Sequence, residues 1–125
     1  MNKVNLFIVG AAKSGTTSLQ RYLKLSKNVF VPRIKEPHYF ADVYIKDKRE
    51  LFNIHDKRDY HSKIVNSLKD YNSLYIDAEQ YLYKVDASPS YLYDNEASTR
   101  IYKYNPDAKI IICLRHPIER AILII

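Results

Sequence analysis

Short apolar runs alternate with amphipathic segments along this chain, in an order that predicts strands followed by helices. Val4–Val9 is a short apolar run that ends at a glycine, as a buried strand often does. Lys109–Leu114 is the clearest buried strand by the same criterion, and Lys84–Ala87 is a shorter candidate. Asn28–Pro32 is a further extended stretch.

The segment Thr16–Lys24, directly after the first apolar run and a short loop, predicts a helix. Thr16 or Thr17 can cap its start, because a hydroxyl can accept a hydrogen bond from the first turn. Its apolar side chains recur at the spacing of one helical face. The predicted face consists of Leu19, Tyr22, Leu23 and Leu25.

The second half of the chain repeats this alternation. Asp94–Tyr104 predicts a helix that Asp94 or Asn95 caps and that Asn105-Pro106 stops. Its predicted buried face consists of Ala97, Ile101 and Tyr104. The remaining expectations are helices over Lys48–Ile54 and Tyr60–Lys69, a strand or loop edge over Ser73–Ala78, and a helix that opens at Arg115-His116-Pro117.

Strands alternating with helices predict parallel βαβ units, and hence an α/β fold. A chain of 125 residues is long enough for one small domain. The sequence ends on the apolar run Ile122–Ile125, inside an expected helix. We therefore expect one partial domain over residues 1–125, truncated on its C-terminal side, whose apolar end favours self-association.

The charge and composition limit the classes of partner. The formal net charge is +6, which suits an anionic ligand, but Lys and Arg are spread along the chain instead of forming a nucleic-acid-binding arm. No segment approaches the roughly 20 apolar residues that cross a bilayer, and the N-terminus lacks a signal-peptide pattern. We therefore expect no nucleic acid, no membrane span and a cytoplasmic protein. The single cysteine, Cys113, lies in an apolar run and predicts a buried, inert thiol.

The loop Gly10-Ala11-Ala12-Lys13-Ser14-Gly15-Thr16-Thr17 joins the first strand to the first helix and contains both glycines of the chain. A helix N-terminus presents backbone N–H groups and a positive dipole end, and glycine lets the backbone approach a ligand. Lys13 adds a cation, and Ser14, Thr16, Thr17 and Ser18 add hydroxyl donors. These features predict a phosphate-binding loop.

The position of the lysine separates this loop from that of ATPases and GTPases. In their G-x-x-x-x-G-K-[ST] pattern the lysine follows the second glycine, whereas Lys13 precedes Gly15. No strand ends in an obvious acidic residue for magnesium. A P-loop nucleotide kinase is therefore only a distant third interpretation.

At these residues the chain resembles the sulfotransferase superfamily, whose 5′-phosphosulfate loop has the same K-x-G-T-T pattern. The resemblance implies a P-loop-like three-layer sandwich with a central parallel sheet. It also implies that Lys13, Ser14, Gly15, Thr16, Thr17 and Ser18 bind 3′-phosphoadenosine 5′-phosphosulfate (PAPS). In the family, Lys13 would contact the bridging oxygen and stabilise the charge that builds on the leaving phosphate, so that no metal is needed.

The run from Lys109 to Ala121 is similar to the family's 3′-phosphate element, a buried strand followed by R-x-P-x-x-R-A-x-S. Arg115 falls on the first arginine, whose planar fork suits phosphate oxygens. The serine of that pattern falls on Leu123, which cannot donate a hydrogen bond. The resemblance therefore implies a 3′-phosphate site of which one half is present.

Lys35-Glu36-Pro37-His38-Tyr39-Phe40 is similar to the K-E-x-x-[FY]-F segment of the branch that includes the heparan sulfate N- and O-sulfotransferases. There the glutamate is the general base, which by position is Glu36, with Lys35 near the reacting sulfuryl group. His38 is the competing base, because its unperturbed pKa suits proton transfer. We favour Glu36 over His38.

A fourth match, Asp86-Ala87-Ser88-Pro89-Ser90-Tyr91, resembles the [EDK]-x-[ST]-P-x-Y element that lines the substrate side of the family's cleft. Ser88-Pro89-Ser90 by itself is only a turn. Heparan 3-O-sulfotransferases carry a lysine where this chain has Ala87, which counts against a specific heparan acceptor.

The four matches run in the family's order from Val4 to Ala121. They imply transfer of a sulfuryl group from PAPS to a hydroxyl or amine acceptor, either a glycan or a small hydroxyl compound. The family domain is typically about twice this length, which keeps a second interpretation open. In that interpretation the chain is a non-catalytic phosphonucleotide-binding fragment or an inactive remnant of a sulfotransferase.

Overall fold

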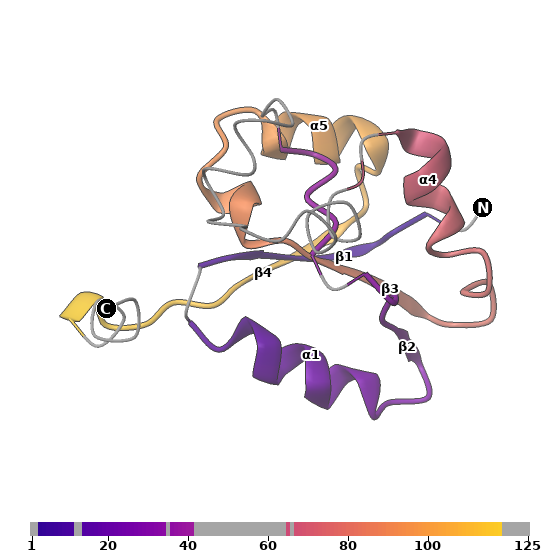
Figure 1. The fold of residues 1–125 in the computed structure, drawn as a ribbon, viewed down its shortest axis with the longest axis horizontal. Helices are drawn as coiled ribbons and strands as arrows, with labels where there is room; N and C mark the ends of the chain where they lie inside the picture. Colours follow the sequence, from indigo (N-terminus) through magenta and orange to yellow (C-terminus); the bar gives the residue numbers. More distant parts are fainter. Residues whose placement is uncertain (1–2, 12–13, 35, 42–64, 66, 119–125) are drawn as a thin grey trace, which may run out of the picture.

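The structure, a computed structural model, describes residues 3–11, 14–34, 36–41, 65 and 67–118 (Figure 1). Four strands pair in the order β2-β3-β1-β4, and every pair is parallel. The strands are β1 (Leu6–Gly10), β2 (Val29–Phe30), β3 (Tyr83–Ala87) and β4 (Lys109–Ile112). The predicted α/β fold with a parallel sheet is confirmed.

Helices cover both faces of this sheet, so that the predicted three-layer arrangement is confirmed. Helix α1 lies on one face, and α4 and α5 lie on the other (Figure 1). The helical elements are α1 (Thr16–Lys24), α4 (Leu68–Ser73), the 3₁₀ helix η1 (Pro89–Leu92) and α5 (Ala97–Tyr104).

The alternation of side chains along β1 supplies both halves of the core. Phe7 and Val9 join a cluster with the α4 and α5 residues Tyr71 and Ile101. Leu6 and Ile8 point to the opposite face and join the cluster against which Leu19 and Leu23 of α1 pack. Successive side chains of a strand point to opposite faces, so an apolar run is required where both faces are covered. The remaining core members come from β3 and from the segments around Phe40 and Tyr75.

Helix α1 covers the predicted residues but differs in its cap and its buried face. Gly15 is the N-cap and has no side chain to bond, so the predicted threonine cap is wrong. Tyr22 and Leu25 are 75% and 83% exposed, so their predicted burial is also wrong. Thr16 and Gln20 are buried in their place. The buried face of α1 is therefore rotated from the predicted apolar face. Thr16 and Gln20 are four positions apart, which places them on one face of the helix.

Helix α5 confirms the predicted buried face and its end at Asn105. Ala97 and Ile101 are buried and Tyr104 is partly buried. The N-cap residue is Glu96, not the predicted Asp94 or Asn95. Asp94 still serves this helix start, because its Oδ1 accepts a hydrogen bond from the Glu96 N–H at 2.9 Å.

The segment before β3 differs most from the prediction. Helix α4 begins at Leu68, because the Ser67 side chain accepts from the Asp70 N–H, so the predicted boundary at Tyr60–Lys69 is wrong where it is described. Ser73 is the last residue of α4 and residues 74–77 form turns, so Ser73–Ala78 contains no strand. The predicted helix over Lys48–Ile54 lies outside the described residues.

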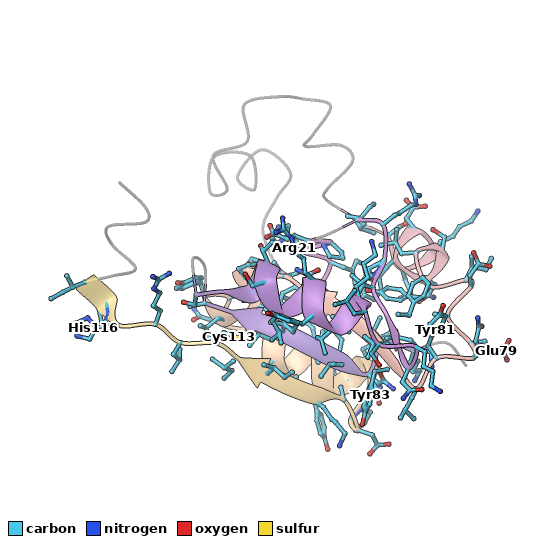
Figure 2. The ribbon with its side chains drawn as sticks, turned by 90° about the horizontal axis from the view of Figure 1, so that it is seen from below. Arg21, Glu79, Tyr81, Tyr83, Cys113 and His116 are labelled. Carbon is cyan, nitrogen blue, oxygen red and sulfur yellow. The ribbon has the colours of Figure 1, made fainter. Side chains whose placement is uncertain are left out.

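Strand β4 lies at the edge of the sheet and pairs only with β1 in the part of the chain that the structure describes. Ile110 and Ile112 are 48% and 52% exposed, so the predicted full burial of this strand is wrong. Cys113 is half-buried, not fully buried as predicted. The chain then extends past the sheet toward His116 (Figure 2), and Pro117 and Ile118 are helical, as expected.

Candidate functional site

The loops that follow β1, β3 and β4 meet at one edge of the sheet, because the carboxyl ends of parallel strands lie on the same side. The Ala11 N–H donates to the Cys113 carbonyl oxygen at 2.7 Å, and the Cys113 N–H donates to the Gly10 carbonyl oxygen at 2.7 Å. The Ser88 N–H donates to the Ile8 carbonyl oxygen at 3.1 Å. Backbone hydrogen bonds therefore hold together the segments after β1, β3 and β4, which are three separate motifs in the sequence.

Gly10 and Gly15 are required in the loop for different reasons. Gly10 has φ 143°, and a Cβ there would lie 3.1 Å from the Leu92 Cβ and 3.3 Å from the Pro89 carbonyl oxygen. Gly15 has φ 87°, a left-handed conformation, and a Cβ there would meet nothing within 4 Å. Gly10 thus allows η1 to pack against the end of β1, whereas Gly15 leaves open space at the start of α1.

The start of α1 has the electrostatics of an anion site. The first turn contains no acidic residue, and Arg21 and Lys24 lie in the last turn. Thr17 and Ser14 are half-buried and Ser18 is exposed, whereas Thr16 is only 7% exposed. No acidic side chain of the first turn therefore offsets the positive end of the helix dipole, and four residues with hydroxyl groups lie in or next to that turn. Lys13 lies outside the described residues.

Arg115 follows β4 at the same edge of the sheet and is exposed. The reciprocal hydrogen bonds of Cys113 fix the chain two residues before it against the loop after β1. Arg120 and Leu123, the other residues of the predicted 3′-phosphate element, lie outside the described residues.

The structure brings Glu36 and His38 together beside the loop that follows β3. The His38 Nε2 lies 3.5 Å from the Glu36 Oε2, and its Nδ1 lies 2.7 Å from the Ser90 Oγ. His38 is 3% exposed, whereas Glu36 is 38% exposed. The imidazole therefore lies behind the carboxylate, between Glu36 and Ser90. Lys35 lies outside the described residues.

A buried cluster around Asp86 lies next to this pair. Asp86 is 0% exposed, and its Oδ1 accepts from the Ser88 hydroxyl at 2.6 Å. Its Oδ2 accepts from the hydroxyls of Tyr71 and Tyr91 at 2.7 and 2.8 Å. Burial raises the pKa of the Asp86 carboxyl, and the three hydroxyl donors and nearby His38 oppose that rise. Burial also raises the pKa of Tyr71 and Tyr91 well above 10.0, and the nearby Asp86 charge adds to the shift.

Sequence reasoning missed this cluster, because it assigned Asp86–Tyr91 only to the substrate side of the cleft. A usable sign was present: Asp86 stands between the apolar residues Val85 and Ala87 of a predicted strand, and a buried carboxylate needs hydrogen-bond donors. The chain also contains 12 tyrosines, and two of them donate their hydroxyl hydrogens to Asp86.

The described residues contain no group of three or more His, Cys, Asp or Glu side chains that could hold a metal ion. None of the described helices is long and apolar enough to cross a membrane.

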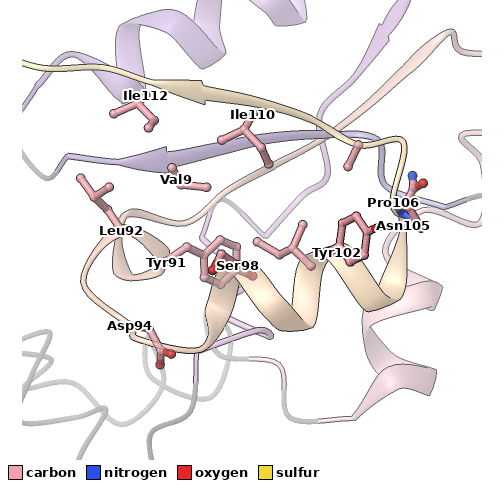
Figure 3. A pocket seen from close by; sticks show the side chains of 12 residues that line it. Val9, Tyr91, Leu92, Asp94, Ser98, Tyr102, Asn105, Pro106, Ile110 and Ile112 are labelled. Atoms are coloured by element: carbon pink, nitrogen blue, oxygen red, sulfur yellow. The ribbon is translucent and has the colours of Figure 1, made fainter.

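A groove of about 360 Å³ lies between α5 and the strands β1 and β4 (Figure 3). Its lining is mainly apolar and includes Ile101, Tyr102, Ile110 and Ile112. None of the residues predicted to bind the nucleotide or to act in catalysis lines it. Tyr91 and Leu92 of η1 also line this α5 groove, which therefore adjoins the site at the strand ends through the loop after β3.

Comparison with known proteins gives results that agree with this geometry. The family model for the Sulfotransferase family matches residues 5–124. A sulfotransferase from Alicyclobacillus acidocaldarius, of known crystal structure, is 32% identical with a TM-score of 0.79, and the match covers 98% of this chain and 48% of that one.

Two curated relatives are also similar. Human heparan sulfate glucosamine 3-O-sulfotransferase 6 is 30% identical over 115 residues, which is 92% of this chain and 28% of that protein. Mouse carbohydrate sulfotransferase 15 is 27% identical over 143 residues, 93% of this chain and 26% of that protein. The chain thus spans about a quarter of the length of these relatives. Because the family model matches nearly its whole length, the chain belongs to the sulfotransferase family.

Proposed function

We propose that this chain forms the donor-binding part of a sulfotransferase that uses PAPS and carries the general base of the reaction. The observation that carries the proposal is the edge of the sheet at which the glycine loop, the segment before Arg115 and the loop after β3 are joined by backbone hydrogen bonds. A sulfuryl-donor nucleotide has anionic groups at both its 5′ and 3′ ends, and this edge has cationic or N–H-rich groups in two places.

The 5′-phosphosulfate would lie on the loop and the start of α1. Ser14, Gly15, Thr16, Thr17 and Ser18 supply backbone N–H groups and hydroxyls there, and Lys13 supplies the cation by sequence. The open space at Gly15 and the lack of acidic residues in the first turn of α1 support this assignment.

The 3′-phosphate would lie on Arg115. A guanidinium can bind two phosphate oxygens at once, and Arg115 is exposed at the same edge as the loop. Arg115 is far from the loop in the sequence. The reciprocal hydrogen bonds of Cys113 with Gly10 and Ala11 hold the chain next to the loop two residues before Arg115.

Glu36 is the better general base of the two candidates. It is 38% exposed, so an acceptor can reach its carboxylate, whereas His38 is 3% exposed. Glu36 takes the proton of the acceptor hydroxyl or amine, and the acceptor lone pair forms the new bond to sulfur. The bond from sulfur to the bridging oxygen breaks, and its electron pair leaves on adenosine 3′,5′-bisphosphate. Lys13 and Lys35 would stabilise that developing charge.

A glycan is the acceptor class that we propose. The two curated relatives are named as sulfotransferases of heparan sulfate glucosamine and of carbohydrate, which supports this class. Ala87 stands where heparan 3-O-sulfotransferases carry a lysine, so a different glycan or a small hydroxyl compound fits this chain better than heparan.

Calorimetric titration with adenosine 3′,5′-bisphosphate tests the proposal without requiring turnover. We expect weak binding, and Arg115→Ala should weaken it about tenfold or more through the loss of charge-assisted hydrogen bonds. Lys109→Ala is the matched control, because it removes an equal charge from the opposite end of β4. Its affinity should stay within about twofold of that of the original chain.

Three results would decide between the alternatives. A folded chain that gives no heat with the bisphosphate excludes donor binding. Equal losses in the Arg115 and Lys109 variants would show non-specific charge attraction. Tighter binding of ATP with magnesium than of the bisphosphate would favour the kinase interpretation.

A further inference from the structure

Asp86 uses both of its carboxylate oxygens to hold hydroxyl groups, and this fixes the direction of the hydrogen bonds around it. Ser88 donates to Oδ1, and Tyr71 and Tyr91 donate to Oδ2. A hydroxyl has a single hydrogen to donate, so each of the three spends it on Asp86. The lone pairs of these hydroxyls are then left to accept.

Two of the three hydroxyls accept from the segment of residues 36–40, which we call the base segment because it carries Glu36. The Ser88 Oγ accepts from the His38 N–H at 3.0 Å, and the Tyr91 hydroxyl accepts from the Phe40 N–H at 3.3 Å. A single carboxylate on β3 is therefore connected, through two hydroxyls, to the backbone on both sides of Tyr39.

The base segment needs such support at His38. Its φ of 55° is in the left-handed region, which non-glycine residues rarely adopt. A conformation of this kind persists only where the surroundings hold it in place. The N–H that Ser88 accepts belongs to this same residue, and the His38 ring lies between Ser90 and Glu36.

We propose that Asp86 is the positioning residue of the base segment: through Ser88 and Tyr91 it fixes the backbone at residues 38 and 40, and so sets where the Glu36 carboxylate lies. The inference rests on the proposed role of Glu36 as the base. Asp86 itself is fully buried, and it acts only through the two hydroxyls.

This arrangement requires that residue 86 accept hydrogen bonds through both of its side-chain polar atoms. An amide in place of the carboxylate offers one accepting oxygen and one donating NH₂ group. In Asp86→Asn, a hydroxyl that faces the NH₂ must accept from it and turn its own hydrogen away. The hydrogen of the Tyr91 phenol stays in the ring plane, so it would then point toward the Phe40 N–H and this connection would be lost.

A matched pair of tyrosine variants isolates the connection from the loss of a buried hydroxyl. Tyr71→Phe and Tyr91→Phe each keep the ring and each remove one donor to Oδ2 of Asp86. Only the Tyr91 hydroxyl also accepts from the Phe40 N–H. Both variants should lose similar stability, but only Tyr91→Phe should disturb the base segment.

Heteronuclear NMR on the nucleotide-free chain measures this difference directly. Tyr91→Phe should speed hydrogen exchange of the Phe40 amide about tenfold relative to Tyr71→Phe, because one hydrogen bond is lost. It should also shift the ring nitrogen signals of His38, which report its contacts with Ser90 and Glu36. Ser88→Ala should do the same at the His38 amide and provides a second, independent variant if Tyr91→Phe does not fold.

The proposal is overturned if Tyr71→Phe and Tyr91→Phe change these signals equally, because the cluster would then contribute stability alone. It is also overturned if neither Tyr91→Phe nor Ser88→Ala moves them. Titration of the same variants with the bisphosphate keeps this test separate from the proposed function. If the variants bind the bisphosphate normally and their base-segment signals are unaltered, only the role of Asp86 is contradicted. If the original chain does not bind the bisphosphate, only donor binding is contradicted.

Discussion

At the scale of single residues, exposure separates the roles of Glu36 and His38. The sequence motif makes both residues candidates for the general base, but only Glu36 presents its side chain to solvent. His38 is enclosed by Ser90 and Glu36 and has a strained backbone. The sequence predicts both residues, because they are neighbours in one short motif. It cannot predict which of them is exposed, because the Ser90 that covers His38 lies 52 positions away.

Sulfuryl transfer under single-turnover conditions distinguishes the two candidate bases. We expect Glu36→Gln to lower the transfer rate by about 10²–10⁴, the usual contribution of general base catalysis. His38→Gln should cost about tenfold, because it loosens Glu36 but leaves its carboxylate in place. Labelled donor incubated with excess protein and a panel of glycan acceptors measures these rates. A greater loss in His38→Gln than in Glu36→Gln would show that the base is the histidine.

The raised pKa of Asp86 predicts a pH dependence of stability with a definite sign. The folded state keeps the Asp86 proton to higher pH than the unfolded chain, whose value is near 3.8. This carboxyl therefore contributes its full stability below that pH and loses it as the pH rises through the folded value. We expect the unfolding free energy of the original chain to fall, relative to that of Asp86→Asn, as the pH is raised from about 4 toward neutrality.

Urea unfolding of both chains across this pH range checks the sign. Only the difference between the two chains is used, since every other titrating group is common to both. A difference that grows in favour of Asp86 with rising pH would contradict the cause assigned to its pKa shift.

At the scale of elements, the sequence predicts the order of strands and helices better than their surroundings. The apolar run at β1 correctly indicates burial on both faces, because α1 and α5 cover them. The same reasoning fails for β4, whose three isoleucines are equally apolar but lie at the sheet edge. Strand order depends on which segments pair, and the local pattern contains no information about that.

The backbone hydrogen bonds between the end of β4 and the glycine loop can be tested by substituting Cys113. Cys113→Pro removes the N–H that donates to the Gly10 carbonyl oxygen, whereas Cys113→Ala keeps it. We expect Cys113→Pro to weaken bisphosphate binding by about tenfold, because the loop and Arg115 lose their common support. Cys113→Ala should bind like the original chain, since the half-buried thiol has no proposed role. Equal affinities of the two variants, measured by calorimetry, would show that this backbone connection does not affect the site.

At the scale of the whole molecule, four exposed aliphatic side chains follow one another along β4 and the segment after it. Ile110, Ile112, Leu114 and Ile118 are between 48% and 77% exposed, on β4 and the segment after it. Two of them, Ile110 and Ile112, also line the α5 groove (Figure 3). Exposed apolar patches and unpaired strand edges promote association between protein molecules.

We therefore expect the isolated chain to self-associate through this edge. Ile112→Lys should shift the sedimentation coefficient toward that of the monomer at a given concentration, because a charge at a strand edge opposes pairing. Leu25→Lys is the matched control, since Leu25 is 83% exposed but lies at the end of α1. An equal shift in both variants would indicate non-specific charge repulsion, and a monomeric original chain would contradict the expectation outright.

We expect the loop between β1 and α1 and the residue Arg115 to bind one and the same nucleotide. Heteronuclear NMR titration with adenosine 3′,5′-bisphosphate tests it most directly, because it shows which residues respond. We expect the amide signals of Gly15, Thr16 and Thr17 and the side-chain signal of Arg115 to shift together along a single binding curve. ATP with magnesium should shift them less. Loop amides that stay unchanged in the folded protein while the bisphosphate is raised to millimolar concentration would contradict it.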